Sequence, residues 1–215
     1  MNRIRVLLAD DHEIVRQGLK ALLDGQPDME VVGEAADGQT ALDGTTTLNP
    51  HVVVLDVSMP HMNGLAATRE IRQRAPASAV VALTRYGDDA YVKELLRAGA
   101  LGYVLKQSPS RELVAAVRSV AAGRPYLDSS LAARAASGMM NGRSRTAGEP
   151  RITDRESEVL RLMALGHSNK DIAAALDLSV KTVEVHKANA MRKLGLKGRT
   201  DIIRFALLKG WLQDP

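Results

Sequence analysis

Short apolar runs alternate with longer amphipathic stretches over residues 4–106. The runs are rich in Val, Leu and Ile and cover Ile4–Ala9, Met29–Ala35, Val52–Leu55, Val80–Thr84 and Gly102–Leu105. The amphipathic stretches carry apolar residues at helical spacing and cover Glu13–Leu23, Gly38–Leu48, Leu65–Arg74, Asp89–Ala98 and Arg111–Ala121. Continuous apolar strands that alternate with helices are typical of parallel βαβ units whose sheet is covered on both faces. The pattern therefore predicts a doubly wound α/β domain with a five-stranded parallel sheet.

One of these helices has a sequence poorly suited to its place. Gly44 is followed by three threonines, Thr45, Thr46 and Thr47. Glycine and β-branched residues have low helix propensity. We therefore expect this helix to be short or frayed.

The last third of the chain shows helical spacing without a strand pattern. Thr153 and Glu156 have the spacing of a capping box that begins a first helix, which Gly166 ends. A second helix is expected over Lys170–Leu176 with Asn169 as its cap, a third runs from the cap Ser179 to about Leu194, and a fourth covers Arg199–Lys209. Two short helices joined by a tight turn are typical of a helix-turn-helix, here within a small all-α domain of four helices.

Small and polar residues dominate the segment between the two patterns. The predicted organisation is a first domain over residues 1–127, a linker over 128–150 and a second domain over 151–215. Residues 131–140 are compatible with a helix at the beginning of this linker. The first domain has 14 Lys and Arg against 15 Asp and Glu, whereas the second has 12 against 8. The basic excess therefore lies in the second domain, as expected for a domain that binds nucleic acid.

Composition excludes several classes of protein. The absence of cysteine rules out a disulfide scaffold and any cysteine-ligated metal centre. The apolar run near the amino terminus is too short for a signal peptide or a membrane span. We therefore expect a soluble cytoplasmic protein that has no membrane segment.

Charged and hydroxyl residues follow the predicted strands. Asp10 and Asp11 come after the first strand, Asp56 ends the third, Thr84 ends the fourth and Lys106 follows the fifth. The carboxyl ends of parallel strands lie at one edge of the sheet, so these side chains should meet there. Clustered carboxylates repel unless a cation joins them, and a set of oxygen ligands suits Mg²⁺. An aspartate in such a site can accept a phosphoryl group while the lysine and the hydroxyl neutralise its charge. His12, in contrast, is expected only to begin the first helix.

These residues resemble the receiver domain of response regulators over residues 4–122. Pro60 and Gly64 match the loop after the acceptor of that family, and Tyr103 matches its switch aromatic. The resemblance implies a flavodoxin-like fold in which Asp56 accepts a phosphoryl group from a sensor histidine kinase and loses it again only slowly. It implies Mg²⁺ as the cofactor, held by Asp10, Asp11, Asp56 and the backbone carbonyl of Ser58. It assigns phosphoryl stabilisation and switching to Thr84, Lys106 and Tyr103.

Two residues near the acceptor differ from many members of that family. Ser58 stands where an asparagine is frequent, and Arg85 follows Thr84 where a small residue is common. Both positions border the path by which water would reach a phospho-aspartate. We hypothesise that they set the lifetime of the phosphorylated state.

The third helix of the second domain has two different faces. Val180, Val183, Ala190, Met191 and Leu194 share the face expected to pack inward. The opposite face offers cations for phosphates, an amide for bases and small apolar groups for thymine methyls. It is formed by Lys181, Thr182, Val185, Ala188, Asn189, Arg192 and Lys193. The pattern is equally compatible with a helical bundle that has a solvated basic face.

A resemblance over residues 152–209 favours DNA binding over the bundle. The segments 152–160, 169–173 and 179–186, with Lys193, Leu194 and Arg199, are similar to the LuxR-type helix-turn-helix of NarL/FixJ response regulators. The resemblance implies sequence-specific contacts with double-stranded DNA and a homodimer when phosphorylated. Glu184 replaces the base-contacting lysine of some relatives and can accept a hydrogen bond from cytosine.

Two other functions compete with a phosphorylation-controlled transcription factor. A covalent phosphatase that uses Asp56 usually needs an acid–base aspartate shortly after the nucleophile, but Val57 and Ser58 follow here. We therefore expect no enzyme activity beyond slow self-dephosphorylation. A DNA-binding protein that ignores phosphorylation is the other alternative, and the complete set of acceptor-site residues argues against it.

Overall fold

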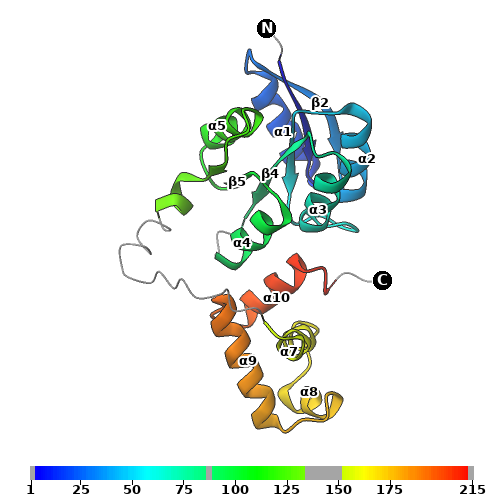
Figure 1. Ribbon diagram of the computed structural model, residues 1–215, viewed down its shortest axis with the longest axis vertical. Coiled ribbons are helices and arrows are strands. Elements are labelled where there is room, and N and C mark those ends of the chain that lie inside the picture. Colours follow the sequence, from blue (N-terminus) through cyan, green and yellow to red (C-terminus); the bar gives the residue numbers. More distant parts are fainter. Residues whose placement is uncertain (1–2, 86–88, 134–151, 213–215) are drawn as a thin grey trace. The chain divides into compact units, whose positions relative to one another are not determined.

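The computed structural model of the protein describes residues 3–85, 89–133 and 152–212 (Figure 1). These residues form two compact units, one amino-terminal and one carboxy-terminal, and each is described by itself. No described helix has both the length and the apolar character that a membrane span needs.

The amino-terminal unit is built on a parallel sheet in the order β2-β1-β3-β4-β5-β6. Its strands are β1 (Ile4–Ala9), β2 (Met29–Ala35), β3 (Val52–Asp56), β4 (Ala79–Thr84), β5 (Gly102–Leu105) and β6 (Tyr126–Leu127). The five predicted strands are present within one residue of their expected bounds. The predicted strand count of five is wrong, because the two-residue strand β6 extends the sheet.

Two buried carboxylates explain why β6 forms. The Tyr126 hydroxyl donates to Glu112 at 2.8 Å, and Asp128, fully buried, accepts from the Leu105 amide at 3.3 Å and from the Ser108 hydroxyl. These contacts hold the chain along β5, where Tyr103 and Leu127 are paired. The anchoring residues come from elements far apart in the sequence, which a local pattern does not reveal. Residues 129–133 then begin the predicted linker helix, whose remaining residues, 134–140, lie outside the described ranges.

Helices cover both faces of this sheet. They are α1 (Glu13–Asp24), α2 (Gly38–Leu48), α3 (Gly64–Arg74), α4 (Asp89–Ala98) and α5 (Ser110–Ala121). Val6 and Leu8 of β1 share a buried cluster with residues of α1 and α5. Leu7 points to the opposite face, because a β-carbon built on Gly44 of α2 would lie 2.8 Å from its Cδ1 atom. Successive strand residues thus supply two apolar layers, as expected for a doubly wound fold.

The expectation of a frayed α2 is wrong. The helix is complete over eleven residues, and Asp37 caps it by accepting from the Thr40 amide. The Thr45 hydroxyl donates to the Ala41 carbonyl at 2.6 Å, so this threonine is fully buried without an unsatisfied polar group. Close packing of Gly44 against β1 supplies the tertiary contact that overrides the low helix propensity.

The carboxy-terminal unit consists of helices within its described residues. They are α7 (Asp154–Ala164), α8 (Asn169–Ala175), α9 (Val180–Leu194) and α10 (Arg199–Leu208) (Figure 1). Thr153 and Glu156 form the predicted capping box, and the Ser179 hydroxyl accepts from the Thr182 amide as expected. Gly195 ends α9 with a left-handed φ of 70°, a conformation that glycine adopts without strain.

Two local predictions in this unit are wrong. The cap of α8 is Ser168, which forms a capping box with Asp171, so Asn169 is instead the first helical residue. Val180 was expected to pack inward, but it is 39% exposed. Val180 is the first residue of α9, at the end of the helix. The centre of the core behaves as predicted, since residues such as Val183 and Ala190 are fully buried.

Candidate functional site

Strand register places two aspartates side by side in the amino-terminal unit. Ala9 of β1 is paired with Leu55 of β3, so the next residues, Asp10 and Asp56, end neighbouring strands at the same level. Their exposed fractions are 1% and 2%. Two carboxylates that are so deeply buried require a compensating positive charge, because the burial of an isolated charge away from water costs free energy.

Lys106 supplies that charge. Its Nζ atom lies 2.7 Å from Oδ2 of Asp10 and 2.7 Å from Oδ2 of Asp56. The lysine follows β5, whose last residue, Leu105, is paired with Thr84 of β4, and the Lys106 amide donates to the Thr84 carbonyl at 2.7 Å. One ammonium group thus bridges two carboxylates that are 46 residues apart in the sequence. The arrangement matches the sequence-based expectation that strand ends would gather these groups.

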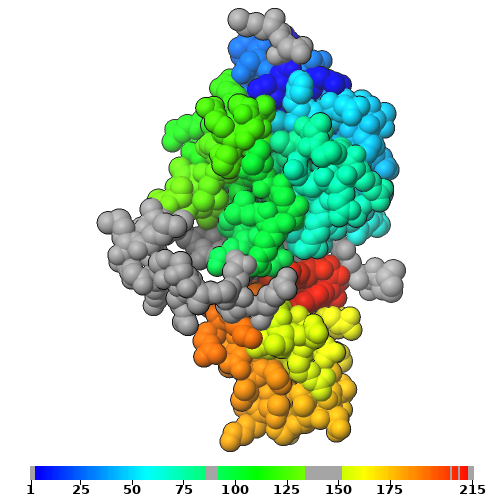
Figure 2. All heavy atoms as spheres, in the orientation of Figure 1, coloured from blue at the N-terminus to red at the C-terminus, as the bar shows by residue number. Residues whose placement is uncertain are grey.

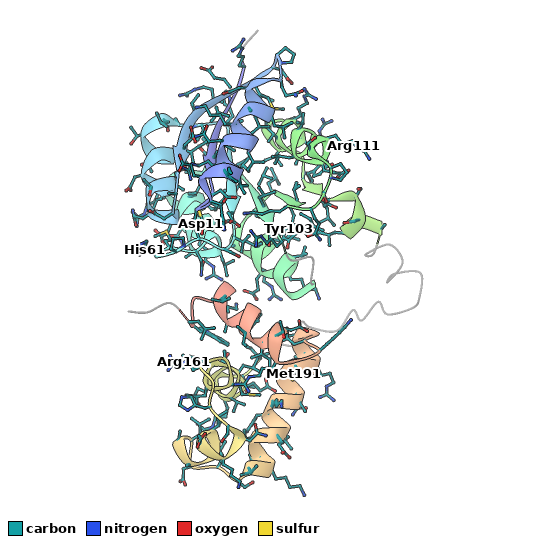
Figure 3. All side chains as sticks on the ribbon, turned by 180° about the vertical axis from the view of Figure 1, so that it is seen from behind. Asp11, His61, Tyr103, Arg111, Arg161 and Met191 are labelled. Atoms are coloured by element: carbon teal, nitrogen blue, oxygen red, sulfur yellow. The ribbon has the colours of Figure 1, made fainter. Side chains whose placement is uncertain are left out.

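The remaining predicted residues lie around this bridge. Thr84 ends β4 one residue beyond Leu83, the partner of Asp56, and is 1% exposed. The Ser58 amide donates to Oδ1 of Asp56 at 3.1 Å. Tyr103, labelled in Figure 3, is fully buried on β5. Arg85 is exposed directly after Thr84. The strand ends therefore bring Asp10, Asp56, Thr84 and Lys106 to one end of the sheet, whereas Tyr103 lies within β5, two residues before the end of that strand.

The electrostatics of Asp56 are those of a partly compensated buried charge. Burial raises the pKa of its carboxyl above the ordinary value, and the negative charge of Asp10 raises it further. The hydrogen bond and positive charge of Lys106 act in the opposite direction. The net pKa is raised, so the single lysine does not fully compensate the carboxylates. A second cation at this position would lower the free energy of the ionised cluster.

The donor set fits a divalent ion. Asp11 adds a third, exposed carboxylate next to the buried pair, and ligand atoms from Asp10, Asp11, His12 and Asp56 all lie within 4.8 Å of one another. Carboxylate oxygens in a partly open site are the ligands that Mg²⁺ takes together with water. The residues present are therefore compatible with magnesium.

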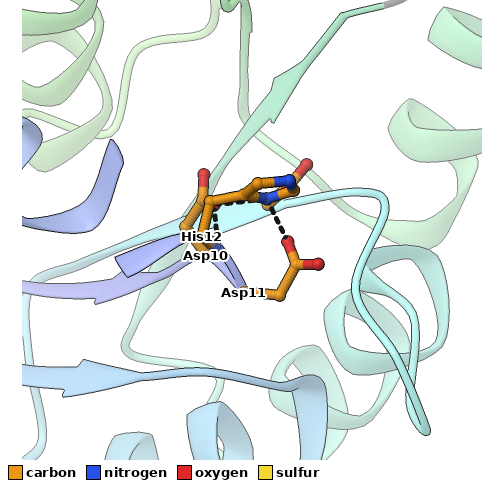
Figure 4. Close-up of side chains that lie close together, drawn as sticks. Asp10, Asp11 and His12 are labelled. Atoms are coloured by element: carbon orange, nitrogen blue, oxygen red, sulfur yellow. Dashed lines mark hydrogen bonds and ion pairs between the residues drawn. The ribbon is translucent and has the colours of Figure 1, made fainter. Parts of the chain in front are cut away.

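His12 is the residue of this site that sequence reasoning dismissed. Its backbone occupies the amino-terminal cap of α1 as expected. Its imidazole Nδ1 atom also lies 2.8 Å from Oδ1 of Asp11 and 3.4 Å from Oδ1 of Asp10 (Figure 4).

Comparisons with known proteins agree with both halves of this description. The family model described as "Response regulator receiver domain" matches residues 6–118, and that described as "Bacterial regulatory proteins, luxR family" matches residues 150–206. The chain is 40% identical to the oxygen regulatory protein NreC of Staphylococcus epidermidis, over 98% of this chain and all of that protein. It is 39% identical to NreC of Staphylococcus carnosus, over 96% of this chain and 98% of that protein.

Solved structures give the same result for the whole chain. RcsB of Salmonella enterica serovar Typhimurium, bound to a promoter in the presence of the phosphomimetic BeF₃⁻, superposes with a TM-score of 0.81 at 29% identity. The match covers 97% of this chain and all of that one. A second RcsB–DNA complex gives a TM-score of 0.77 at 28% identity. The chain belongs to the NarL/FixJ family of two-component response regulators.

As a response regulator, the protein couples phosphorylation of its receiver to DNA binding and to regulation of transcription. Its third carboxy-terminal helix, α9, presents most of the predicted DNA-contact residues to solvent. Lys181, Glu184, Ala188 and Arg192 are exposed, and Val185 is 52% exposed. An exposed apolar side chain among cations and small residues is a suitable surface for the floor of a major groove.

Four predicted contact residues of this response regulator, Thr182, Asn189, Arg192 and Lys193, have partners within the protein. The Thr182 hydroxyl lies 2.8 Å from that of Ser179, and the Asn189 side-chain oxygen accepts from Arg192 at 2.9 Å. Lys193 lies on α9 with its Nζ atom 2.8 and 2.7 Å from the two carboxylate oxygens of Glu156. Glu156 is 3% exposed, so this ion pair links α9 to the interior of α7. The helical wheel placed Lys193 beside the outer face and gave no sign of this partner.

Proposed function

We propose that Asp56 is the phospho-acceptor of this response regulator. The observation that carries the proposal is the Lys106 ammonium, which lies 2.7 Å from both Asp56 and Asp10 beside the end of β4. A carboxylate that accepts a phosphoryl group needs a cation held nearby to neutralise the transferred negative charge. A lysine held between two carboxylates meets that need. Thr84 is the hydroxyl that would bind the phosphoryl oxygen, and Tyr103 is the aromatic that would respond to it.

Magnesium completes the proposed site. The ligands would be the carboxylates of Asp10, Asp11 and Asp56 and the backbone carbonyl of Ser58. When bound, the ion would supply the positive charge that a dianionic phosphoryl group requires for transfer. Lys106 would also neutralise negative charge on that group, and the buried position of Asp56 limits the access of water. These features support slow self-dephosphorylation and no turnover of external phosphoesters.

The proposed DNA surface is the outer face of α9. It comprises Lys181, Thr182, Glu184, Val185, Ala188, Asn189, Arg192 and Lys193. Exposed Lys181 and Arg192 are suited to phosphates or guanine, whereas Val185 and Ala188 are suited to thymine methyl groups. Lys193 would have to break or weaken its ion pair with Glu156 to reach a DNA phosphate. We therefore rank Lys193 below Arg192 as a DNA contact.

The wider biological setting follows from the family. We propose a sensor histidine kinase as the phosphoryl donor, a homodimer as the phosphorylated form and the cytoplasm as the location. The RcsB structures include one described as two dimers bound to two parallel DNAs, which supports the dimer. The proposed boundaries are a receiver over residues 1–127, a linker over 128–150 and a DNA-binding domain over 151–215.

The acceptor is tested with Asp56→Asn in the full-length protein. Incubation with Mg²⁺ and acetyl phosphate should shift the wild-type protein on a phosphate-affinity gel and leave the variant unshifted. The same treatment should tighten operator binding by the wild-type protein only. Asp43→Asn is the matched control, because Asp43 is an exposed carboxylate on α2 away from the strand ends, and it should behave like wild type.

Two results would refute this proposal. Phosphorylation of Asp56→Asn at the wild-type rate would move the acceptor to another residue. Equal gains in DNA affinity for wild type and variant would separate DNA binding from Asp56 altogether. Rapid turnover of p-nitrophenyl phosphate by the wild-type protein would instead favour the phosphatase.

A further inference from the structure

One buried carboxylate joins the loop that carries Lys106 to the start of the linker. Asp128 is fully buried and directly follows β6. Its Oδ2 atom accepts from the Leu105 amide at 3.3 Å and from the Ser108 hydroxyl at 2.5 Å. Its Oδ1 atom accepts from the amide and the hydroxyl of Ser130, at 3.0 and 2.6 Å. One oxygen therefore contacts residues on either side of Lys106, and the other contacts the linker.

Asp128 is also the cap of the helix that begins the linker. Residues 129–133 are helical, and the amides of Leu131 and Ala132 donate to the Asp128 carbonyl at 3.0 and 2.9 Å. An aspartate whose side chain accepts from the amide two residues later is a usual helix cap. The Asp128 amide in turn donates to the Tyr103 carbonyl of β5 at 2.9 Å. The first turn of the linker helix is therefore held to the strand that leads to Lys106.

The Asp128 carboxylate is an acceptor on both sides. Burial acts to raise its pKa, but the hydrogen bonds from Ser108, Ser130 and the Leu105 amide outweigh burial, so the pKa lies below its ordinary value. An ionised carboxylate has no proton to donate and accepts at both oxygens. Loss of either oxygen as an acceptor would leave a backbone amide without its partner.

A second carboxylate holds the same segment from a different side. Glu112 of α5 accepts from the Tyr126 hydroxyl at 2.8 Å, and from the amide and the hydroxyl of Ser129 at 3.2 and 3.0 Å. In the space-filling view, the yellow-green segment that follows β6 lies against the green surface of α5 (Figure 2). Among the described residues, none of these Glu112 contacts involves the loop that carries Lys106. Glu112 thus anchors the linker, whereas Asp128 anchors it and also contacts that loop.

Phosphorylation of Asp56 would change the position that the Lys106 ammonium has to take. That ammonium contacts the carboxylates of Asp10 and Asp56 at 2.7 Å each. Transfer forms a P–O bond to one carboxylate oxygen of Asp56, which removes the carboxylate charge and places negative charge on the phosphoryl oxygens. The ammonium would follow that charge, and the loop from Leu105 to Ser108 would shift with it.

We propose that Asp128 is a positioning residue that transmits this shift of the Lys106 loop to the linker helix. The inference rests on the proposed function, because it needs phosphorylation of Asp56. A shift of the loop changes the contacts of Oδ2, and the same planar carboxylate holds Ser130 through Oδ1. Phosphorylation therefore alters the stability of the first turn of the linker helix.

Hydrogen exchange of the full-length protein at residues 129–133 tests this coupling. Acetyl phosphate with Mg²⁺ donates the phosphoryl group and leaves as acetate, and a phosphate-affinity gel of the same samples gives the phosphorylated fraction. Phosphorylation should change the exchange of this segment in the wild-type protein. Asp128→Asn should abolish that change at equal phosphorylated fraction. An asparagine has one acceptor oxygen, so it cannot satisfy both the Leu105 and the Ser130 amides.

Glu112→Gln is the matched control. It also removes a buried acceptor at the linker start, but not one that contacts the Lys106 loop. Exchange of residues 129–133 should become faster in both states of this variant, and the difference that phosphorylation makes should remain. Ser108→Ala is a second test, because it removes one loop contact and leaves the Asp128 carboxylate in place. It should reduce the difference, and it decides by the same comparison if Asp128→Asn does not fold.

The possible failures are distinguishable. A phosphorylation-dependent difference that survives in Asp128→Asn and Ser108→Ala would overturn the coupling and leave Asp128 with a structural role. Equal loss of the difference in Glu112→Gln, or no difference in the phosphorylated wild-type protein, would overturn it as well. Failure of Asp128→Asn alone to accept the phosphoryl group would also overturn it, since Asp128 would then act in the transfer. Absence of phosphorylation in the wild-type protein would instead refute the proposed function itself.

Discussion

Each half of this response regulator pairs a partly exposed lysine with a buried carboxylate, and the two contacts are equally short. In the receiver, Lys106 lies 2.7 Å from Asp56, and in the DNA-binding unit Lys193 lies 2.7 Å from Glu156. The surroundings of the two contacts differ. Lys106 serves two buried carboxylates, with Asp11 nearby, whereas Lys193 contacts both oxygens of Glu156, which also accepts from the Thr153 amide at 2.8 Å.

The pKa values show what this difference means. The pKa of Asp56 is raised because burial outweighs the help of Lys106. The pKa of Glu156 is lowered, because the hydrogen bond and charge of Lys193 and the Thr153 amide outweigh its burial. The receiver cluster therefore has more negative than positive charge and can bind another cation, and we call it undercompensated. The Lys193–Glu156 contact is a complete ion pair that stabilises the packing of α9 against α7. The balance of charge around a contact, rather than its length, distinguishes a reactive site from a structural one.

Removal of the lysine from the complete pair should have the largest effect. We expect Lys193→Met to lower the free energy of unfolding of the DNA-binding unit by about 3 kcal/mol, because Glu156 stays buried without its partner. Trp211 is the only tryptophan of the chain and packs edge-on against Phe205, so its fluorescence during urea unfolding follows this unit alone.

Arg192→Met is the matched control for that experiment. Arg192 is the exposed neighbour of Lys193 on α9, and its replacement should change stability by less than about 0.5 kcal/mol. Equal stability of the two variants would mean that the Lys193–Glu156 pair is not structural, and Lys193 would then rank with Arg192 as a DNA contact.

Removal of a carboxylate from the receiver cluster should have the opposite effect on stability. Asp56→Asn removes one of the carboxylates that share Lys106, so we expect the metal-free receiver to gain about 1 kcal/mol of stability. Hydrogen exchange of the β1 and β3 amides measures this stability without interference from the other unit. Asp43→Asn should leave the exchange unchanged. A less stable Asp56→Asn receiver would show that Lys106 fully compensates the cluster and would remove the contrast between the two sites.

This contrast also marks the limit of prediction from the sequence. The ends of apolar strands indicated that Asp10, Asp56, Thr84 and Lys106 would meet, because parallel strands fix which ends are adjacent. A helical wheel, in contrast, describes only one helix, and the partner of Lys193 lies 37 residues away. The same reason explains the missed strand β6, whose anchors come from other elements.

A fall in pH should change the stability of the two units in opposite directions. The DNA-binding unit should become less stable and the receiver more stable. The lowered pKa of Glu156 gives a stabilising contribution that is complete above the ordinary value of 4.5 and is lost as pH falls through the folded value below it. The raised pKa of Asp56 gives a contribution that is complete below 3.8 and is lost as pH rises through the folded value above it. These effects should be smaller than those of the substitutions, because both residues remain in place.

Comparison of the pH dependence of stability in each wild-type unit with that of a variant lacking its carboxylate separates these contributions from those of other titrating groups. Trp211 fluorescence should show a pH dependence of unfolding that Glu156→Gln makes flatter on the acid side. Hydrogen exchange in the receiver should show a dependence of the opposite sign that Asp56→Asn makes flatter. The same sign in both units would contradict the assignment of one cluster as undercompensated.

The smallest expected effect concerns access to the two carboxylates. Glu156 and Asp56 are both buried, but two residues close to the receiver cluster in the sequence, Ser58 and Arg85, are exposed. We expect Arg85→Ala to shorten the half-life of phosphorylated Asp56 by about twofold, which is less than 0.5 kcal/mol of activation free energy, because its bulk slows the entry of water. The rate of phosphate loss after removal of acetyl phosphate measures this half-life, and Arg69→Ala, on the exposed surface of α3, is the control. An unchanged half-life would mean that water reaches the phosphoryl group by a path that does not pass Arg85.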